Sequence, residues 1–386
     1  MDMNYKTYTM EDALDAIIDY RGKTPKKSES GIPTLSAKTV RNNFIDYNNC
    51  YYISEEEYKR FMVRGFPKVG DILLTTEAPL GMTAKLNRAD VALAQRLLTL
   101  RGKTDILDND YLLYFLQSPK GQHLLKSHET GTTVTGIKQA VFRKLEISIP
   151  SITIQKQIAI ILSSIDEKIS VNTKINENLE QQVQAIYVQM FIKNATDSWK
   201  KGSLSDIAVI TMGQSPKGDT FNKAGEGAVF YQGRTDFGFR FPTRRLYTTE
   251  PKRIALYGDT LISVRAPVGD LNVAYEDCCI GRGLAAVHSK DNHQSFVLYT
   301  LFALNKQLNI FNGEGTVFGS INKESLNSMG ITIPPIELIN KFESIAKPID
   351  RAILNNYKEI CRLQAIRDTL LPKLMCGEID VSKVQI

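Results

Sequence analysis

The sequence lacks several features that would assign it to a common class of protein. No apolar stretch in its 386 residues approaches the roughly 18 residues that cross a bilayer, so no membrane span is predicted. The start, MDMNYKTYTMEDALD, is acidic and polar, unlike a secretory signal. The five cysteines are odd in number and form no CxxC pair, which argues against a disulfide framework. We therefore expect a cytoplasmic protein without membrane contact.

Motifs for stand-alone catalysis are also missing. Gly22–Thr24 has the appearance of the end of a phosphate-binding P-loop, but Ile17 occupies the position of its first glycine. The chain has no Asn/Asp-Pro-Pro-aromatic motif for adenine methylation. His288 and His293 are five residues apart, off one helical face, and no cysteine is placed to join them around a metal. We expect no catalytic residue, no metal site and no cofactor on this chain.

What the sequence does contain is a long stretch that occurs twice. Pro150–Phe191 matches Pro334–Met375 under one constant shift without a gap. In both copies apolar residues recur every three or four positions, which is the spacing of one helical face. Each copy therefore predicts an amphipathic helix of roughly 35–40 residues, about 55–60 Å long.

A helix of this length needs a partner of equal length, and only the other copy offers one. We expect the two helices to pack as an antiparallel coiled coil. Pro348 has no counterpart in the first copy and removes a backbone donor, so we expect a kink or restart near Ala346–Pro348. The predicted core residues of the helix pair are Ile158, Ile165, Ile169, Leu179, Ile186, Ile349, Ile353, Leu363 and Leu370.

Each long helix follows a segment of mixed strand and loop character, and these two segments also correspond. Gly213–Pro216 matches Gly22–Pro25, and Gly258–Gly269 matches Gly70–Gly81. Short apolar runs between glycines and prolines favour an irregular sheet over a βαβ series. The predicted fold is α+β, with two similar domains in tandem and pseudo-two-fold symmetry. The predicted boundaries are residues 1–149 for the first domain, 150–198 for the first helix and linker, 199–333 for the second domain, and 334–386 for the second helix and tail.

Basic residues cluster with polar and aromatic side chains in both domains. The net charge of +6 permits nucleic-acid binding without requiring it. Lys and Arg neutralise phosphates, while Arg, Asn and Gln pair with base edges. Glu77 and Arg265 occupy aligned positions, a difference that discrimination between two half-sites would require. The predicted DNA-binding residues are Lys26, Lys27, Lys38, Arg41, Asn42, Arg64, Gln214, Lys217, Gln232, Arg234, Arg240, Arg244 and Arg265.

This arrangement resembles the DNA specificity (S) subunit of type I restriction-modification enzymes over nearly the whole chain. Gly22–Pro25 and Gly213–Pro216 look like the family's Gly-x-[Thr/Ser]-Pro motif. Pro150, with the Gln and Ile that follow it, fits the family's P-x4-Q-x2-I helix entry, and Leu370–Ile379 looks like its LLPKLxxGEI end. The second helix departs from the pattern, because Ile339 stands where the family has Gln.

The resemblance implies a non-catalytic subunit that binds a bipartite site in double-stranded DNA. It also implies two methyltransferase subunits as partners and, in the full complex, two restriction (motor-nuclease) subunits. S-adenosylmethionine, ATP and Mg²⁺ would belong to those partners. The alternatives are a coiled-coil adaptor with two protein-binding heads, a specificity subunit of a methylation-only system, and a self-contained methyltransferase or nuclease, against which the missing motifs count.

Overall fold

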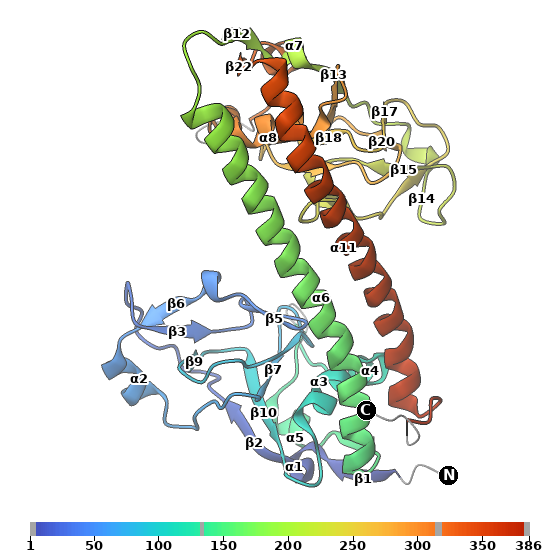
Figure 1. Cartoon of the computed structure of the whole chain (residues 1–386). Helices are drawn as coiled ribbons and strands as arrows, with labels where there is room; N and C mark the ends of the chain where they lie inside the picture. The colour runs from blue at the N-terminus through green and yellow to red at the C-terminus, as the bar shows by residue number, and fades with distance from the viewer. Residues whose placement is uncertain (1–4, 132–134, 313–318, 382–386) are drawn as a thin grey trace. The chain divides into compact units, whose positions relative to one another are not determined.

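A computed structural model gives the structure of the chain and describes residues 5–131, 135–312 and 319–381 (Figure 1). The chain divides into two compact units: unit 1 comprises Met1–Val171 and Glu359–Ile386, and unit 2 comprises Asn172–Lys358. This division cuts both long helices, which the sequence analysis had treated as segments of their own. No helix in the described ranges is long and apolar enough to cross a membrane.

Unit 1 is built around a four-stranded antiparallel sheet. Its strands are β1 (Lys6–Thr9), β2 (Leu14–Asp19), β3 (Ile32–Leu35), β4 (Val40–Arg41), β5 (Phe44–Ile45), β6 (Tyr51–Ile53), β7 (Ile72–Thr75), β8 (Thr83–Lys85), β9 (Ala92–Leu93), β10 (Leu97–Gly102) and β11 (Glu146–Ile149). The main sheet has the order β2-β10-β7-β8. A second sheet places β3 antiparallel to β6 and parallel to β9, and β1 pairs with β11. The short helices are α1 (Met10–Ala13), η1 (Tyr47–Asn49), α2 (Glu55–Phe61), α3 (Asn109–Gln117), α4 (Pro119–Ser127) and α5 (Gln139–Arg143).

Unit 2 repeats this topology. Its strands are β12 (Lys200–Ser203), β13 (Ala208–Met212), β14 (Phe221–Asn222), β15 (Ala228–Tyr231), β16 (Tyr247–Thr248), β17 (Ile254–Ala255), β18 (Thr260–Ser263), β19 (Leu271–Val273), β20 (Cys278–Ile280), β21 (Leu284–Ser289) and β22 (Gly330–Ile333). The main sheet runs β13-β21-β18-β19, β15 lies antiparallel to β16 and parallel to β20, and β12 pairs with β22. Its short helices are α7 (Leu204–Ile207), η3 (Gly218–Thr220), η4 (Arg234–Asp236), α8 (Gln294–Ala303), α9 (Asn305–Asn309), η5 (Ile310–Asn312) and α10 (Lys323–Asn327). The main sheets, the second-sheet strands around β3 and β15, and the terminal strand pairs correspond, so the two units share one α+β core. The β4–β5 hairpin occurs in unit 1 alone among the described residues, and β14 and β17 extend the second sheet of unit 2.

Two long helices supply part of the core of each unit. In Figure 1, α6 (Ile152–Tyr187, 36 residues) is green and α11 (Ile336–Cys376, 41 residues) is red. A π-helical turn, η2 (Val188–Lys193), continues α6. Both lengths agree with the amphipathic helices predicted from the sequence. In unit 1 the main core holds Leu162 of α6 together with Leu374 of α11, and in unit 2 it holds Tyr187 together with Phe342.

Within each unit the two helices run antiparallel. In unit 1 Asp166 contacts Arg367 at 2.8 Å, and Lys168 lies 4.0 Å from Glu359. In unit 2 Asn176 contacts the backbone of Ile353 at 3.1 Å, and the ring of Tyr187 lies 5.6 Å from that of Phe342. Higher numbers on α11 thus meet lower numbers on α6, as the sequence analysis expected. Of the predicted core residues, Ile158 and Ile353 are buried. The other seven are half-buried: Ile165, Ile169, Leu179, Ile186, Ile349, Leu363 and Leu370.

Asparagines that the apolar pattern did not reveal are buried in the helix pair. Asn172 and Asn176 are both nearly inaccessible to solvent. The Nδ2 of Asn176 donates to the carbonyl of Ile353, and its Oδ1 accepts a 2.9 Å bond from Asn356 Nδ2. A buried Asn satisfied in this way fixes the register of paired helices at some cost in stability.

The expected kink or restart near Ala346–Pro348 was wrong, since α11 is helical without interruption from Ile336 to Cys376. Pro348 lies on the exposed side of the helix, as does Ser344 one turn earlier. The carbonyl that loses its intrahelical donor there can be hydrated by solvent, so the helix tolerates the proline.

The entry to the two long helices differs, as the replacement of Gln by Ile339 suggested. In unit 1 Gln155 is buried, and its Nε2 donates to the carbonyls of Ile106 (2.8 Å) and Pro150 (2.9 Å). Its Oε1 accepts a 3.0 Å bond from the backbone N–H of Asp108. Ile339 offers no such bonds and is instead buried in the apolar core of unit 2.

We expect Gln155→Ala to lower the free energy of unfolding by about 2–5 kcal/mol, because one buried and two partly buried backbone groups would lose their partner. The measurement is urea unfolding followed by circular dichroism. Gln181→Ala makes the same change at an exposed position of α6 and is the control, with an expected effect within about 0.5 kcal/mol. Equal stabilities of the two variants would show that the Gln155 bonds do not hold the helix entry.

Candidate nucleic-acid interface

The domain of unit 1 is fastened to the long helices by a shared carboxylate. Tyr114 of α3 donates its hydroxyl to Asp166 Oδ2 of α6 at 2.8 Å, and Asn43 Nδ2 donates to the same oxygen at 2.8 Å. Arg367 of α11 donates to Asp166 Oδ1. Burial raises the pKa of Tyr114, and the adjacent carboxylate raises it further, so the hydroxyl keeps its proton and remains a donor. One aspartate thus ties a helix and a loop of the domain to both long helices.

Unit 2 has a corresponding contact with Arg240 at its centre. Tyr299 of α8 donates to Asp350 of α11 at 2.9 Å. Arg240, only 4% exposed, forms ion pairs with Glu180 of α6 at 2.6 Å and with Asp350, and it also donates to Tyr299. Burial opposes the charge of Arg240, but Tyr299, Asp350 and Glu180 outweigh that effect and raise its pKa. Arg240 was predicted to bind DNA, but its guanidinium is buried and bonded to Glu180, Asp350 and Tyr299, which argues against that contact.

The six predicted DNA-binding residues of unit 1 are all exposed: Lys26, Lys27, Lys38, Arg41, Asn42 and Arg64. Several are held in place by their own domain. Lys27 Nζ lies 4.9 Å from the centre of the Tyr51 ring. Arg41 donates to the carbonyl of Val40 at 2.8 Å, and Arg64 donates to the carbonyl of Asp19 at 3.0 Å. These residues present positive charge to solvent, and their contact with DNA stays a prediction.

The remaining predicted residues of unit 2 are also exposed: Gln214, Lys217, Gln232, Arg234, Arg244 and Arg265. Two of the arginines have acidic partners. Arg234 pairs with Asp270 at 2.5 Å, and Arg244 pairs with Glu276 at 2.5 Å. Such half-exposed pairs hold a side chain in position but contribute little to stability.

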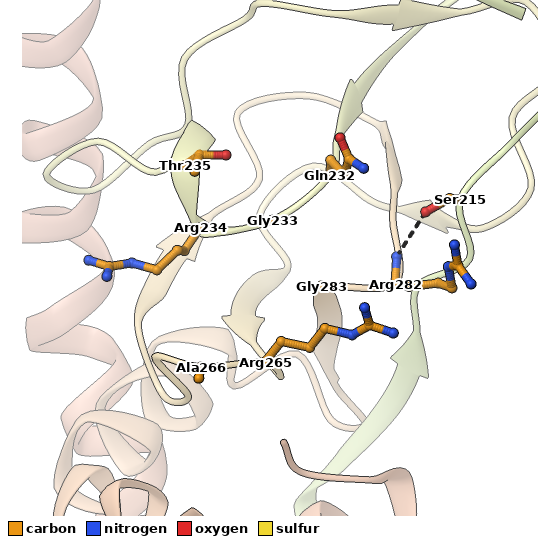
Figure 2. Close-up of a pocket in the computed structure, with 9 residues that line it drawn as sticks. All are labelled: Ser215, Gln232, Gly233, Arg234, Thr235, Arg265, Ala266, Arg282 and Gly283. Atoms are coloured by element: carbon orange, nitrogen blue, oxygen red, sulfur yellow. Dashed lines mark hydrogen bonds between the residues drawn. The ribbon is translucent and has the colours of Figure 1, made fainter. Parts of the chain in front are cut away.

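Three arginines gather around one recess of unit 2, which we call the arginine recess (Figure 2). Its volume is about 250 Å³, and it is lined by Ser215, Gln232, Gly233, Arg234, Thr235, Arg265, Ala266, Arg282 and Gly283. Arg234 is paired with Asp270, whereas Arg265 and Arg282 have no acidic partner within the described ranges. Sequence reasoning omitted Arg282 from the candidate site. Gly281 and Gly283, on either side of Arg282, were the signal in the sequence, because paired glycines indicate that the backbone lies close to another segment.

The same place in unit 1 carries the opposite charge. Strand registers Leu97↔Thr75 and Leu284↔Ser263 align the two domains, so that Glu77 stands where unit 2 has Arg265. Glu77 forms ion pairs with Arg96 at 2.7 Å and with Arg21 at 3.2 Å. The position of Arg282 is taken by Gln95, which donates to Thr24 Oγ1 at 2.6 Å. The same backbone arrangement therefore carries different hydrogen-bonding side chains in unit 1 and in unit 2.

Comparison with known proteins places this fold in a family. The model of the type I restriction modification DNA specificity domain matches residues 4–181 and 196–360. The protein designated as the MjaX type I restriction enzyme specificity subunit of Methanocaldococcus jannaschii is 30% identical over 404 residues, covering 98% of this chain and 94% of the relative. The MjaIX specificity subunit of the same organism is 26% identical over 399 residues, covering 92% and 88%.

A solved structure, the type I restriction-modification S subunit from M. genitalium, has the same fold. Its TM-score is 0.60 at 18% identity, over 97% of this chain and 96% of that one. The chain therefore belongs to the type I restriction-modification DNA specificity family, with two specificity domains in tandem. It is a specificity subunit, the member of such a system that determines where the system acts on DNA.

We expect Arg240→Ala to destabilise unit 2 by about 3 kcal/mol, because the partly buried carboxylates of Glu180 and Asp350 would lose their counter-charge. Arg265→Ala removes the same side chain from an exposed position and should leave unfolding unchanged within about 0.5 kcal/mol. Thermal and urea unfolding of the two variants measure the difference. If Arg240→Ala proved as stable as Arg265→Ala, the ion-paired cluster would not fasten the domain.

Proposed function

We propose that this chain binds a bipartite site in double-stranded DNA, one half-site with each unit, and carries no catalytic site of its own. The observation that supports the proposal is the charge reversal between Glu77 and Arg265 on one shared backbone frame. A duplicated domain that bound the same ligand twice would keep the same groups at this place. Two half-sites of different sequence need different groups there.

The exposed basic residues of both units support duplex DNA as the ligand. Lysines and arginines at the surface displace counterions from phosphates, which contributes affinity that does not depend on sequence. Among described residues, no group of three His, Cys, Asp or Glu side chains is arranged to hold a metal ion. In this proposal the chemistry therefore lies with partner subunits.

Two methyltransferase subunits and, in the full complex, two restriction subunits are the proposed partners. They would hold S-adenosylmethionine, ATP and Mg²⁺. An exposed apolar stripe on α6 favours docking by partners: Ile160 is 45% exposed and Val171 is 43% exposed. The two residues are about three helical turns apart and so lie on one side of the helix. The cognate methyltransferase would cover this stripe.

We expect the purified chain alone neither to methylate nor to cut plasmid DNA in the presence of S-adenosylmethionine, ATP and Mg²⁺. Co-expression with its cognate adenine methyltransferase subunit should produce methylation at a split sequence, read by methylation sequencing of the host genome. Turnover by the isolated chain would contradict the proposal. A methylated sequence without a split would contradict its bipartite part.

We also expect the two units to be exchangeable independently. Replacing residues 1–150 with the corresponding segment of a relative should change one half of the methylated sequence and leave the other half intact. The reason is that each half would be bound by a separate domain with its own loops. The control replaces residues 199–333 and should change the opposite half. Changes in both halves from either exchange would show that the domains do not act separately.

A further inference from the structure

The arginine recess brings together, from neighbouring strands, two guanidinium groups that pair with no acidic side chain among the described residues. Arg265 follows the end of β18, and Arg282 precedes the start of β21, where Ser263 is paired with Leu284. Figure 2 shows both guanidinium groups on the same side of the recess, while Arg234 points away from them. The backbone hydrogen bonds between β18 and β21 thus hold the backbones of Arg265 and Arg282 side by side.

The floor of the recess is made by a close approach of backbones. A Cβ at Gly283 would lie 2.7 Å from the carbonyl oxygen of Gln232, and one at Gly281 would lie 3.0 Å from its Cα. A side chain at Gly283 would require the backbone to shift, and one at Gly281 would require its neighbour to move by a few tenths of an ångström. The backbone N–H of Arg282 donates to Ser215 Oγ at 3.3 Å, which links a third segment to the floor. The backbone of Gln232 is therefore held next to the Arg282 segment, and Gln232 lines the same recess as Arg265.

Two like charges that have no counter-charge in residues 5–131, 135–312 and 319–381 favour a ligand that offers several hydrogen-bond acceptors. In DNA these are the phosphate oxygens and, in the major groove, the N7 and O6 atoms of guanine, which an arginine fork contacts in pairs. The phosphates are the same in both half-sites, so a phosphate contact would call for a cation at this place in each unit. Unit 1 has Glu77 there, bound by Arg96 and Arg21. The charge reversal therefore favours a base over a phosphate.

We propose that Arg265 and Arg282, with Gln232 beside them, contact the major-groove edge of guanine and determine that base in the second half-site. This inference rests on the proposed function and deepens it, since it names the base and the residues that select it. Glu77 in unit 1 cannot donate to guanine acceptors, so the corresponding position of the first half-site is not selected as guanine in the same way.

The test is a binding selection with the full-length chain and a random duplex library, followed by sequencing. Arg265→Ala should abolish the preference for guanine at one position and weaken binding to the preferred duplex about 5- to 150-fold. Arg265→Lys restores the charge without the fork, and it should recover affinity for all duplexes without recovering the preference. Arg282→Ala should affect the same position of the selected sequence.

The matched control is Arg351→Ala, which removes an exposed arginine of α11 outside the recess and should leave the selected sequence unchanged. Circular dichroism checks that each variant is folded. A salt titration separates the two contact types: uniform weakening, with the salt slope reduced by about one and the preference retained, would identify a phosphate contact and overturn the inference. An unchanged preference in Arg265→Ala would overturn it as well. If the wild-type chain and its methyltransferase complex bound no duplex, the proposed function itself would fail.

Discussion

A partly buried aspartate on a long helix makes the contact on which the arrangement of each unit depends. Asp166 and Asp350 occupy equivalent positions of the repeat, and each accepts a hydrogen bond from a tyrosine of the domain. A carboxylate in such a place is costly unless it is saturated with donors. The two units meet this need differently: Arg367 comes from a long helix, and Arg240 comes from the domain. The domain therefore packs against the long helices in the orientation in which all of these donors reach the aspartate.

The contact between each domain and its helix aspartate belongs to the part of the domain that stabilises the fold. Other parts of the domain are free to vary. The main sheet, the paired terminal strands and the tyrosine–aspartate contact recur in both units. The groups that follow β7 and β18 do not recur, since one unit has Glu77 and the other has Arg265. Substitution at these places leaves the core untouched, so a specificity domain can acquire a new preference without a new fold.

The sequence was sufficient for the features that follow from periodicity and repetition. The apolar spacing identified both long helices, and the constant shift between the copies identified the tandem domains. It was insufficient where position in space decides the role of a side chain. Arg240 lies in a basic, aromatic stretch like its exposed neighbours, while its carboxylate partners are 60 and 110 residues away in the chain. The sequence shows that Pro348 lacks a backbone donor, and this suggested a break in the helix. It does not show that Pro348 faces solvent, where the helix tolerates the missing hydrogen bond.

The division of the long helices has a consequence for synthesis on the ribosome. Unit 2 is one continuous stretch, Asn172–Lys358, and can close its core as soon as that stretch has emerged. Unit 1 needs Leu371, Leu374 and Met375, which are translated after the whole of unit 2. The domain made first is thus completed after the second one, and until then its part of α6 has an uncovered apolar face. A nascent chain that stalls between Lys358 and Leu371 would carry one finished specificity domain and one that still requires its closing segment.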